Sequence, residues 1–212
     1  MKRIEAISKH TKGIHTLLDI GTDHGYLLID ALNHGYIKKG IAADINASPL
    51  KNAEKNIKAA GLDHLVEFRL SDGFLNIELD YDGVVIAGMG MHLVKSILSQ
   101  PHKKPIKYIV SVHTHIDQFR AFLSESGFMI LDETVVFERF YYVIFTLMFK
   151  QDTLTAMDIY LGPILKNKKE STQYYRHLLT INEKIMAVAP IKKRKILEIH
   201  NNWLKDTIHR FI

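Results

Sequence analysis

Three aspartates at regular intervals are the residues of this sequence whose types and spacing best suit binding chemistry. Asp19 comes near the end of a short apolar run, Asp44 follows 25 positions later, and Asp72 another 28 positions on. If these runs are parallel strands of one sheet, their carboxyl ends meet at a single edge. Carboxylates accept hydrogen bonds from hydroxyl and amino groups. The three therefore favour a ligand that carries hydroxyls and an amine over one that carries phosphates.

A glycine turn directly follows the first aspartate. The run 17–25 reads Leu-Leu-Asp-Ile-Gly-Thr-Asp-His-Gly, an apolar strand that leads through a tight turn into a helix. Gly21 lets backbone amides come close to a ligand, as in nucleotide-type sites of α/β sheets. Asp23 would repel a pyrophosphate at the helix N-terminus, so the turn disfavours NAD and ATP. Asp23 either accepts a bond from the ammonium of a methionine moiety or caps the following helix.

The second and third aspartates complete a nucleoside site in this interpretation. Asp44 can accept two ribose hydroxyls, as acids do at the second strand of dinucleotide sites. Asp72, in Ser-Asp-Gly at 71–73, can accept the exocyclic amine of adenine. Each acid by itself is more typical of a cap or a turn. The joint spacing of all three predicts S-adenosyl-L-methionine as the ligand.

A second glycine-rich turn follows the fourth apolar run, at 86–91 (Ile-Ala-Gly-Met-Gly-Met). Its glycines let the backbone approach a flat ring, and Met89 and Met91 supply soft apolar walls. A ring nitrogen already has a free lone pair, so its methylation needs alignment and exclusion of water rather than a base. The alternative is a small-residue turn that packs on the sheet. We place Met89 and Gly90 among the predicted catalytic positions.

Two histidines follow the fifth apolar run, His113 and His115. Their spacing suits a metal, but no third ligand is apparent nearby, so we predict no metal site. His113 is interpreted as a hydrogen-bond donor or stacking ring in the substrate pocket, and we add it to the predicted catalytic positions. The alternative is a histidine of a surface loop.

Strand and helix patterns alternate through the first two thirds of the chain. Apolar runs predict strands over 16–20, 40–45, 66–70, 81–87 and 107–112. Helices are expected over 25–34, 48–60, 91–99 and 116–126, with another over 3–12 before the first strand. Ser48 is the predicted N-cap of the helix over 48–60, with Pro49 at its first helical position. Such alternation predicts a parallel sheet with right-handed crossovers.

The pattern changes after Gly127. Two adjacent β-rich runs, 128–137 and 141–150, predict an antiparallel hairpin. From 155 onward apolar residues have helical spacing, with a break at 187–190, which predicts two amphipathic helices folded back on each other. We therefore expect an α/β, Rossmann-like class I methyltransferase sheet of five parallel strands plus a hairpin over 1–150. A basic helical hairpin is expected over 151–212.

Composition places further bounds on the class of protein. The 212 residues are 47% hydrophobic, which is ordinary for a globular chain. The absence of cysteine excludes disulfides, thiol catalysis and thiolate metal sites, and is compatible with a reducing cytoplasm, where we expect the protein to act. No apolar run is long enough to span a bilayer, and the first residues lack an apolar signal core, so no membrane association is expected.

Positive charge is concentrated at the C-terminal end. Residues 1–149 hold 16 Lys and Arg against 17 Asp and Glu, whereas residues 150–212 hold 12 against 6. A basic appendage on a nearly neutral body indicates a polyanionic partner, because phosphate contacts give affinity without sequence preference. The alternative is an ordinary solvated helical surface.

Three strings carry a resemblance to a known family: Asp-Ile-Gly-Thr-Asp-His-Gly-Tyr-Leu at 19–27, Ile-Ala-Gly-Met-Gly at 86–90, and Leu-Gly-Pro at 161–163. Together they resemble the bacterial tRNA adenine-N1 methyltransferases that modify position 22 of tRNA, through most of the chain. The resemblance implies that the turn at 89–91 faces the adenine and that the C-terminal helices hold the tRNA. It also implies an S-adenosyl-L-methionine site, to which we add the adjacent Thr22, Ile45 and Gly73. The predicted cofactor-binding residues are Asp19, Gly21, Thr22, Asp23, His24, Asp44, Ile45, Asp72, Gly73 and Gly88.

The chain departs from the family pattern at three places. Leu28 stands where proline is common, Met91 where a glycine is common, and Ser-Val-His at 111–113 where Gln-Pro-Asn is frequent. The last departure falls at the expected pocket of the target base. Two other hypotheses therefore stay open: an RNA-binding protein without catalysis, and a methyltransferase for a substrate other than RNA. The oligomeric state also stays open, with a monomer favoured.

Overall fold

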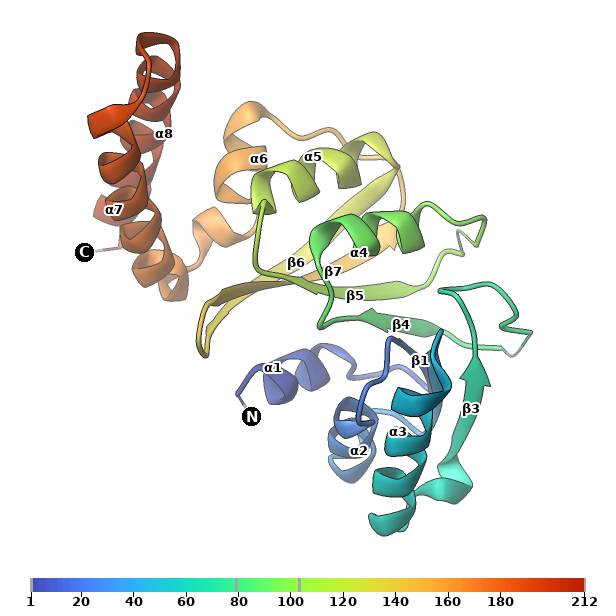
Figure 1. The fold of residues 1–212 in the computed structure, drawn as a ribbon. Coiled ribbons are helices and arrows are strands. Elements are labelled where there is room, and N and C mark those ends of the chain that lie inside the picture. The colour runs from blue at the N-terminus through green and yellow to red at the C-terminus, as the bar shows by residue number, and fades with distance from the viewer. Residues whose placement is uncertain (1, 79, 103, 212) are drawn as a thin grey trace.

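Seven strands form one mixed sheet in the computed structural model, which describes residues 2–78, 80–102 and 104–211 (Figure 1). The strand order is β3-β2-β1-β4-β5-β7-β6. β1 is central, parallel to β2 on one side and to β4 on the other, so the strands that bear the aspartates lie next to one another. The strands are β1 (Thr16–Ile20), β2 (Lys39–Asp44), β3 (Val66–Leu70), β4 (Gly83–Ile86), β5 (Lys107–Val112), β6 (Phe128–Phe137) and β7 (Tyr141–Phe149).

The hairpin closes the sheet on one side, as the sequence predicts. β7 runs antiparallel to β5, with Val110 opposite Phe145. β6 pairs with β7 in turn and shifts register between Ile130 and Asp132. Insertion of β7 between β5 and β6 gives the mixed seven-stranded sheet of a Rossmann-like methyltransferase, and the prediction of that fold is confirmed.

Helices cover both faces of this sheet (Figure 1). The first three helices pack on one face around Ile7, Leu28 and Ile57. The next two pack on the other face around Val94 and Phe119. The helices are α1 (Lys2–His10), α2 (Tyr26–Asn33), α3 (Ala47–Ala59), α4 (Met91–Leu98), α5 (Ile116–Glu125), α6 (Ala156–Leu161), α7 (Thr172–Val188) and α8 (Ile191–His209), with short 3₁₀ turns at Asp63–Leu65, Leu165–Asn167 and Lys169–Ser171.

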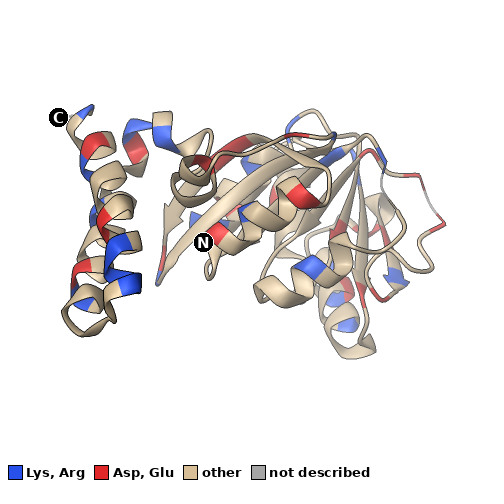
Figure 2. Ribbon diagram, turned by 90° about the horizontal axis from the view of Figure 1, so that it is seen from above, with Lys and Arg blue, Asp and Glu red and all other residues tan. Residues whose placement is uncertain are grey.

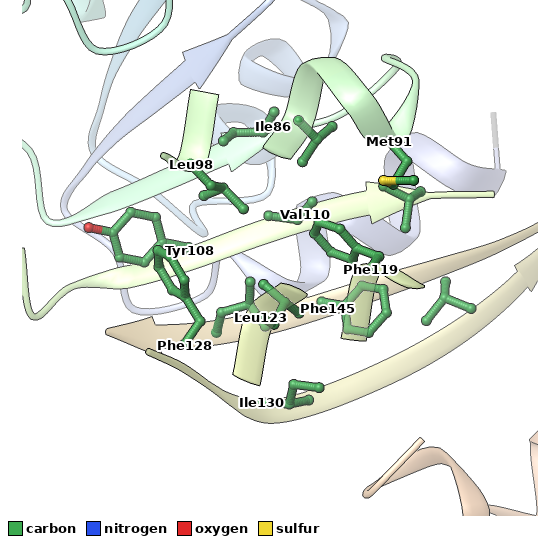
Figure 3. Packing of buried hydrophobic residues seen from close by; sticks show 14 of the residues in the cluster. Ile86, Met91, Leu98, Tyr108, Val110, Phe119, Leu123, Phe128, Ile130 and Phe145 are labelled. Atoms are coloured by element: carbon green, nitrogen blue, oxygen red, sulfur yellow. The ribbon is translucent and has the colours of Figure 1, made fainter. Parts of the chain in front are cut away.

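Aromatic rings from β5, α5 and the hairpin fill the second face (Figure 3). Tyr108 and Phe128 meet edge to face, with ring centroids 5.4 Å apart. Phe119 and Phe145 meet in the same way at 5.3 Å. These four side chains are fully buried. Such pairs add about 0.5–1.5 kcal/mol each beyond the burial of their area, and they fasten the hairpin to the parallel part of the sheet.

The start of α3 differs from the prediction. Asn46, not Ser48, is its N-cap residue, and Pro49 lies in the first turn rather than at the first position. The Asp44 carboxylate accepts a hydrogen bond from the Asn46 amide at 2.8 Å, which turns the chain as soon as β2 ends. Proline is tolerated there because amides of the first helical turn have no partner within the helix.

A buried ion pair fastens the segment that leads to the C-terminal helices. Arg120 of α5 and Glu133 of β6 are both fully buried, and Nε lies 2.7 Å from Oε1. Arg120 also donates to the Ile159 and Tyr160 carbonyls at the end of α6. Glu133 accepts from the amides of Ile164 and Leu165.

The chain ends in two helices, α7 and α8, that pack against each other. Asn182 and Asn201 link them through a buried side-chain hydrogen bond of 2.7 Å. Lys and Arg are spread along this pair (Figure 2). Within the described residues, no helix combines the length and the apolar character that crossing a membrane requires.

Candidate active site

A cavity of about 530 Å³ opens at the carboxyl edge of β1, β2, β3 and β4. This volume lies within the range typical of small-molecule and cofactor sites. All ten predicted cofactor-binding residues line it, together with Met89. The three aspartates that are regularly spaced in the sequence thus line the same cavity. The other lining residues are Arg3, Ile4, Ile7, Ile20, Gly25, Tyr26, Leu27, Asn46, Ser71, Ala87, Leu93 and Ile97.

Asp19 is the most deeply placed carboxyl group of this cavity, only 6% exposed. Burial raises the pKa of Asp19 to about 6, because desolvation disfavours the ionised form, and the nearby Asp44 carboxylate acts in the same direction. The Thr22 hydroxyl opposes the shift. A carboxyl group in this state gains from a cationic or hydrogen-bond-donating ligand.

The turn after β1 requires glycine. Gly21 has φ +81°, and a Cβ atom there would lie 2.0 Å from the Met89 Cε atom. The Gly21 amide donates to the Ala43 carbonyl at 2.8 Å, so the turn is tied to the end of β2. Met89, on the turn after β4, therefore packs directly on the glycine of the first turn.

Asp23 and His24 are exposed at the mouth of the cavity, with His24 Nε2 3.2 Å from Asp23 Oδ2. His24 also stacks on Tyr26, with centroids 5.3 Å apart. The alternative that Asp23 caps the following helix is wrong: the N-cap of α2 is Gly25, and no side chain bonds to the cap. The Asp23 carboxylate is left facing the cavity.

The end of β2 combines a carboxylate with an apolar side chain. Asp44 is held by its bond from the Asn46 amide, and its carbonyl accepts from the Ser71 amide at 2.8 Å. Ile45, beside it, is 59% exposed although it is a large apolar residue. An acceptor next to an uncovered apolar face suits a hydroxylated sugar attached to a flat ring.

Gln100, which follows α4, shapes the loop that carries Asp72. Its Oε1 accepts from the Phe74 amide at 2.7 Å, and its Nε2 donates to the Asp72 carbonyl at 3.2 Å. A Cβ atom on Gly73 would lie 2.4 Å from Gln100 Oε1, so the loop needs glycine to accept this support. Gln100 is not among the predicted site residues, because no local pattern in the sequence marks it.

The N-terminal helix contributes to the cavity as well. Arg3, Ile4 and Ile7 of α1 line it. The Arg3 guanidinium carbon lies 4.6 Å from the centroid of the Tyr142 ring, which fastens the start of α1 to the hairpin. The sequence predicts this helix but not its place over the cavity. The sequence pattern at 3–12 indicates only that a short helix precedes the first strand, not what that helix covers.

The structure separates the predicted catalytic positions. Met89 lines the cavity, with Gly88 at φ +81° beside it. Gly90 is the N-cap of α4 and is not among the lining residues. His113 lines a different cavity, between the end of β5, the hairpin tip and α7. Among the described residues, no group of three or more His, Asp or Glu side chains could hold a metal ion.

The chain is similar in sequence to known proteins. The family profile described as "Methyltransferase domain" matches residues 1–145. The tRNA (adenine(22)-N(1))-methyltransferase of Bacillus subtilis is 25% identical over 98% of this chain and 96% of its own length.

Solved structures agree over the full length, including the C-terminal helices. Streptococcus pneumoniae Sp1610, in complex with S-adenosyl-L-methionine, has 28% identity and a TM-score of 0.85, with 99% of each chain covered. M. capricolum TrmK, in complex with S-adenosyl-homocysteine, has 26% identity and a TM-score of 0.84, with 100% of this chain and 99% of that one covered. The similarity is therefore not confined to the Rossmann-like sheet.

Proposed function

Because this chain belongs to the tRNA (adenine(22)-N(1))-methyltransferase family of class I S-adenosylmethionine-dependent methyltransferases, we propose that it methylates N1 of an adenine in tRNA, at position 22. The observation that carries the proposal is that Asp19, Asp44 and Asp72 line one cavity together with Met89 of the turn after β4. Similarity over nearly the full length to the tRNA (adenine(22)-N(1))-methyltransferase of Bacillus subtilis supports the choice of substrate.

The residues of the cavity fit S-adenosyl-L-methionine. We assign Asp44 to the ribose hydroxyls and Asp72 to the exocyclic amine of the adenine, with Ile45 against the ring. Asp19 and Asp23 are assigned to the ammonium of the methionine moiety, since carboxylates pair well with that group. The cofactor, when bound, supplies a methyl group on a positively charged sulfur.

The chain's own contribution is positioning and exclusion of water. The N1 atom of adenine has an available lone pair, so no side chain has to remove a proton before the transfer. Met89 gives the site an apolar wall, and Gly88, which has nothing within 4 Å of an added Cβ, leaves room for a flat ring to approach the backbone. A base that is paired in a helix has to be flipped out of its stack to enter.

RNA binding without catalysis is a second candidate. One observation favours it: His113, at the place where the family pattern often has asparagine, lines the other cavity. In that case the cavity at β1–β4 would bind the cofactor without transferring its methyl group to RNA.

The test is incubation of the protein with isotope-labelled S-adenosyl-L-methionine and unmodified tRNA, followed by nucleoside mass spectrometry. We expect labelled 1-methyladenosine, mapped to position 22, from wild type. Asp44→Asn keeps an acceptor for the Asn46 amide but loses the charge, so we expect the product to fall at least tenfold. Asp63→Asn, an exposed acid on the 3₁₀ turn before β3, is the matched control. Absence of any labelled nucleoside, with intact cofactor binding, would favour the second candidate.

A further inference from the structure

A second cavity, of about 360 Å³, lies where the sheet meets the C-terminal helices. We call it the junction pocket. It is formed by the loop after β5 with the start of α5, by the tip of the β6–β7 hairpin, and by residues of α6 and α7. In Figure 1 the hairpin tip extends toward the start of α7. The pocket is lined by His113, His115, Ile116, Asp117, Phe137, Arg139, Phe140, Tyr141, Tyr160, Tyr174, His177, Leu178, Ile181 and Asn182.

Aromatic rings dominate its walls. His113 and Phe140 stack with centroids 5.8 Å apart and planes at 24°. On the side of α7, Tyr141 lies 5.0 Å from the His177 ring and 5.4 Å from the Tyr174 ring. Phe140 remains 50% exposed. Its ring therefore adds little to the core and leaves aromatic surface accessible beside His113, and every nucleobase can stack on such a surface.

Two charged groups complement the rings. The Arg139 guanidinium carbon lies 5.5 Å from the Phe140 ring centroid, in reach of a phosphate attached to a base stacked there. Asp117, at the start of α5, is exposed and can accept from an amine or ring N–H of a base. A base linked to a phosphate satisfies both charges, whereas a simple anion would meet the Asp117 carboxylate unfavourably.

Position also favours RNA as the occupant. β4 and β5 are adjacent, with Ile86 opposite Val110, so the two cavities open at neighbouring strand ends on one edge of the sheet. They share no lining residue. A base in the junction pocket is consequently a different base from the one brought to the cofactor.

We infer that the junction pocket binds an unpaired base of the RNA substrate, close to but distinct from the base that is methylated. This inference rests on the proposed function, since it assumes that RNA is the substrate. Two bases held on one edge of the sheet would fix the register of the RNA, and the choice of target position would then depend on both.

The test measures affinity for an unmodified tRNA transcript by fluorescence anisotropy. Phe140→Ala is expected to raise the Kd roughly 5- to 150-fold, the range for loss of one base–aromatic stack, with unchanged affinity for S-adenosyl-L-methionine. Phe140→Tyr should restore binding. Tyr36→Ala removes a half-buried ring from the opposite edge of the sheet, between α2 and β2, and should leave the Kd unchanged.

A series of transcripts, each with one abasic nucleotide, identifies the base. We expect one position, other than the methylated one, at which the abasic change and Phe140→Ala are non-additive, because both remove the same contact. Additive losses at every position overturn the inference. If wild type forms 1-methyladenosine while all losses are additive, only the inference that the junction pocket binds a base is refuted. If one position is non-additive but no methylation occurs, only the proposed function fails. Lack of tRNA binding by wild type refutes both.

Discussion

Asp19 shows how a single residue of the site is maintained at a cost to folding. Its carboxyl group is buried beside Asp44, and its pKa is raised to about 6. Between pH 4 and 6 the native state therefore binds more protons than the unfolded state, whose carboxyl group titrates near its ordinary value. The contribution of Asp19 to stability falls as pH rises through this window and stays unfavourable at pH 7. A residue retained under this cost is typical of a binding site.

Asp19→Asn should accordingly stabilise the free protein at pH 7 and weaken cofactor binding. We expect the Tm to rise by at least roughly 2 °C, with the difference from wild type vanishing near pH 4, where both side chains are neutral. Wild-type affinity for S-adenosyl-L-methionine should fall as pH decreases from 7 to 5, and the variant should lack that dependence. Thermal unfolding and calorimetry across this range measure both. A variant less stable than wild type at pH 7 would contradict the assignment.

The predictable residues of the site are those whose role follows from position on a strand. Asp19, Asp44 and Asp72 were identified because strand ends of a parallel sheet converge, and all three line one cavity. Arg3 and Gln100 have no local sequence signal, because Arg3 reaches the cavity from α1 and Gln100 supports the Asp72 loop from the segment after α4. His113, predicted for the substrate pocket, lines the junction pocket and not the cavity of Met89, because its ring packs against Phe140 and Tyr142 of the hairpin, which the sequence pattern does not show.

At the scale of elements, Gly162 forms the turn that ends α6. It has φ +99° and ψ 130°, a conformation essentially confined to glycine. A Cβ atom there would lie 2.5 Å from Glu133 Oε2 and 2.6 Å from Arg120 Nη2. The buried ion pair thus leaves no space for a side chain at this turn.

Gly162→Ala is expected to lower the free energy of unfolding by about 3 kcal/mol or more, through backbone strain together with displacement of the buried ion pair. Gly61→Ala is the matched control: φ is +73°, and nothing lies within 4 Å of the added methyl. It should cost only about 1 kcal/mol, the strain of the left-handed conformation. Urea unfolding monitored by circular dichroism gives both values. Equal losses would show that the ion pair adjusts to the methyl group.

The periodicity of apolar residues predicts the regular strands and helices of this chain, but not its short, irregular segments. The runs at 16–20, 66–70 and 107–112 are strands with the predicted bounds. Between 155 and 172 the structure instead has one short helix and two 3₁₀ turns, because Gly162 and the following proline interrupt helical spacing. The conformation of this segment is fixed by hydrogen bonds to the side chains of Arg120 and Glu133. Both residues are distant in the sequence, so no local pattern shows these contacts.

At the scale of the whole molecule, the excess positive charge lies apart from the cavity at β1–β4. Four aspartates, Asp19, Asp23, Asp44 and Asp72, line that cavity at one edge of the sheet. The excess positive charge lies in residues 150–212. The junction pocket lies between these two regions. In the proposed function, an RNA held by α7 and α8 passes the junction pocket before it reaches the turn at Met89. We therefore propose that affinity comes from the helices, register from the junction pocket and methyl transfer from the cavity at β1–β4.

Reversal of charge on α8 tests this division. Lys192, Lys193 and Lys195 are exposed near its start; their joint replacement by Glu should weaken tRNA binding at least tenfold at low salt. The slope of log K against log salt should become shallower by up to about 3, since each lost phosphate contact contributes about 0.9. Replacement by Glu of Lys51, Lys55 and Lys58, three exposed lysines of α3, changes net charge equally at a distance from α8 and should have a much smaller effect. Equal losses in both variants would show that total charge, and not the C-terminal helices, attracts the RNA.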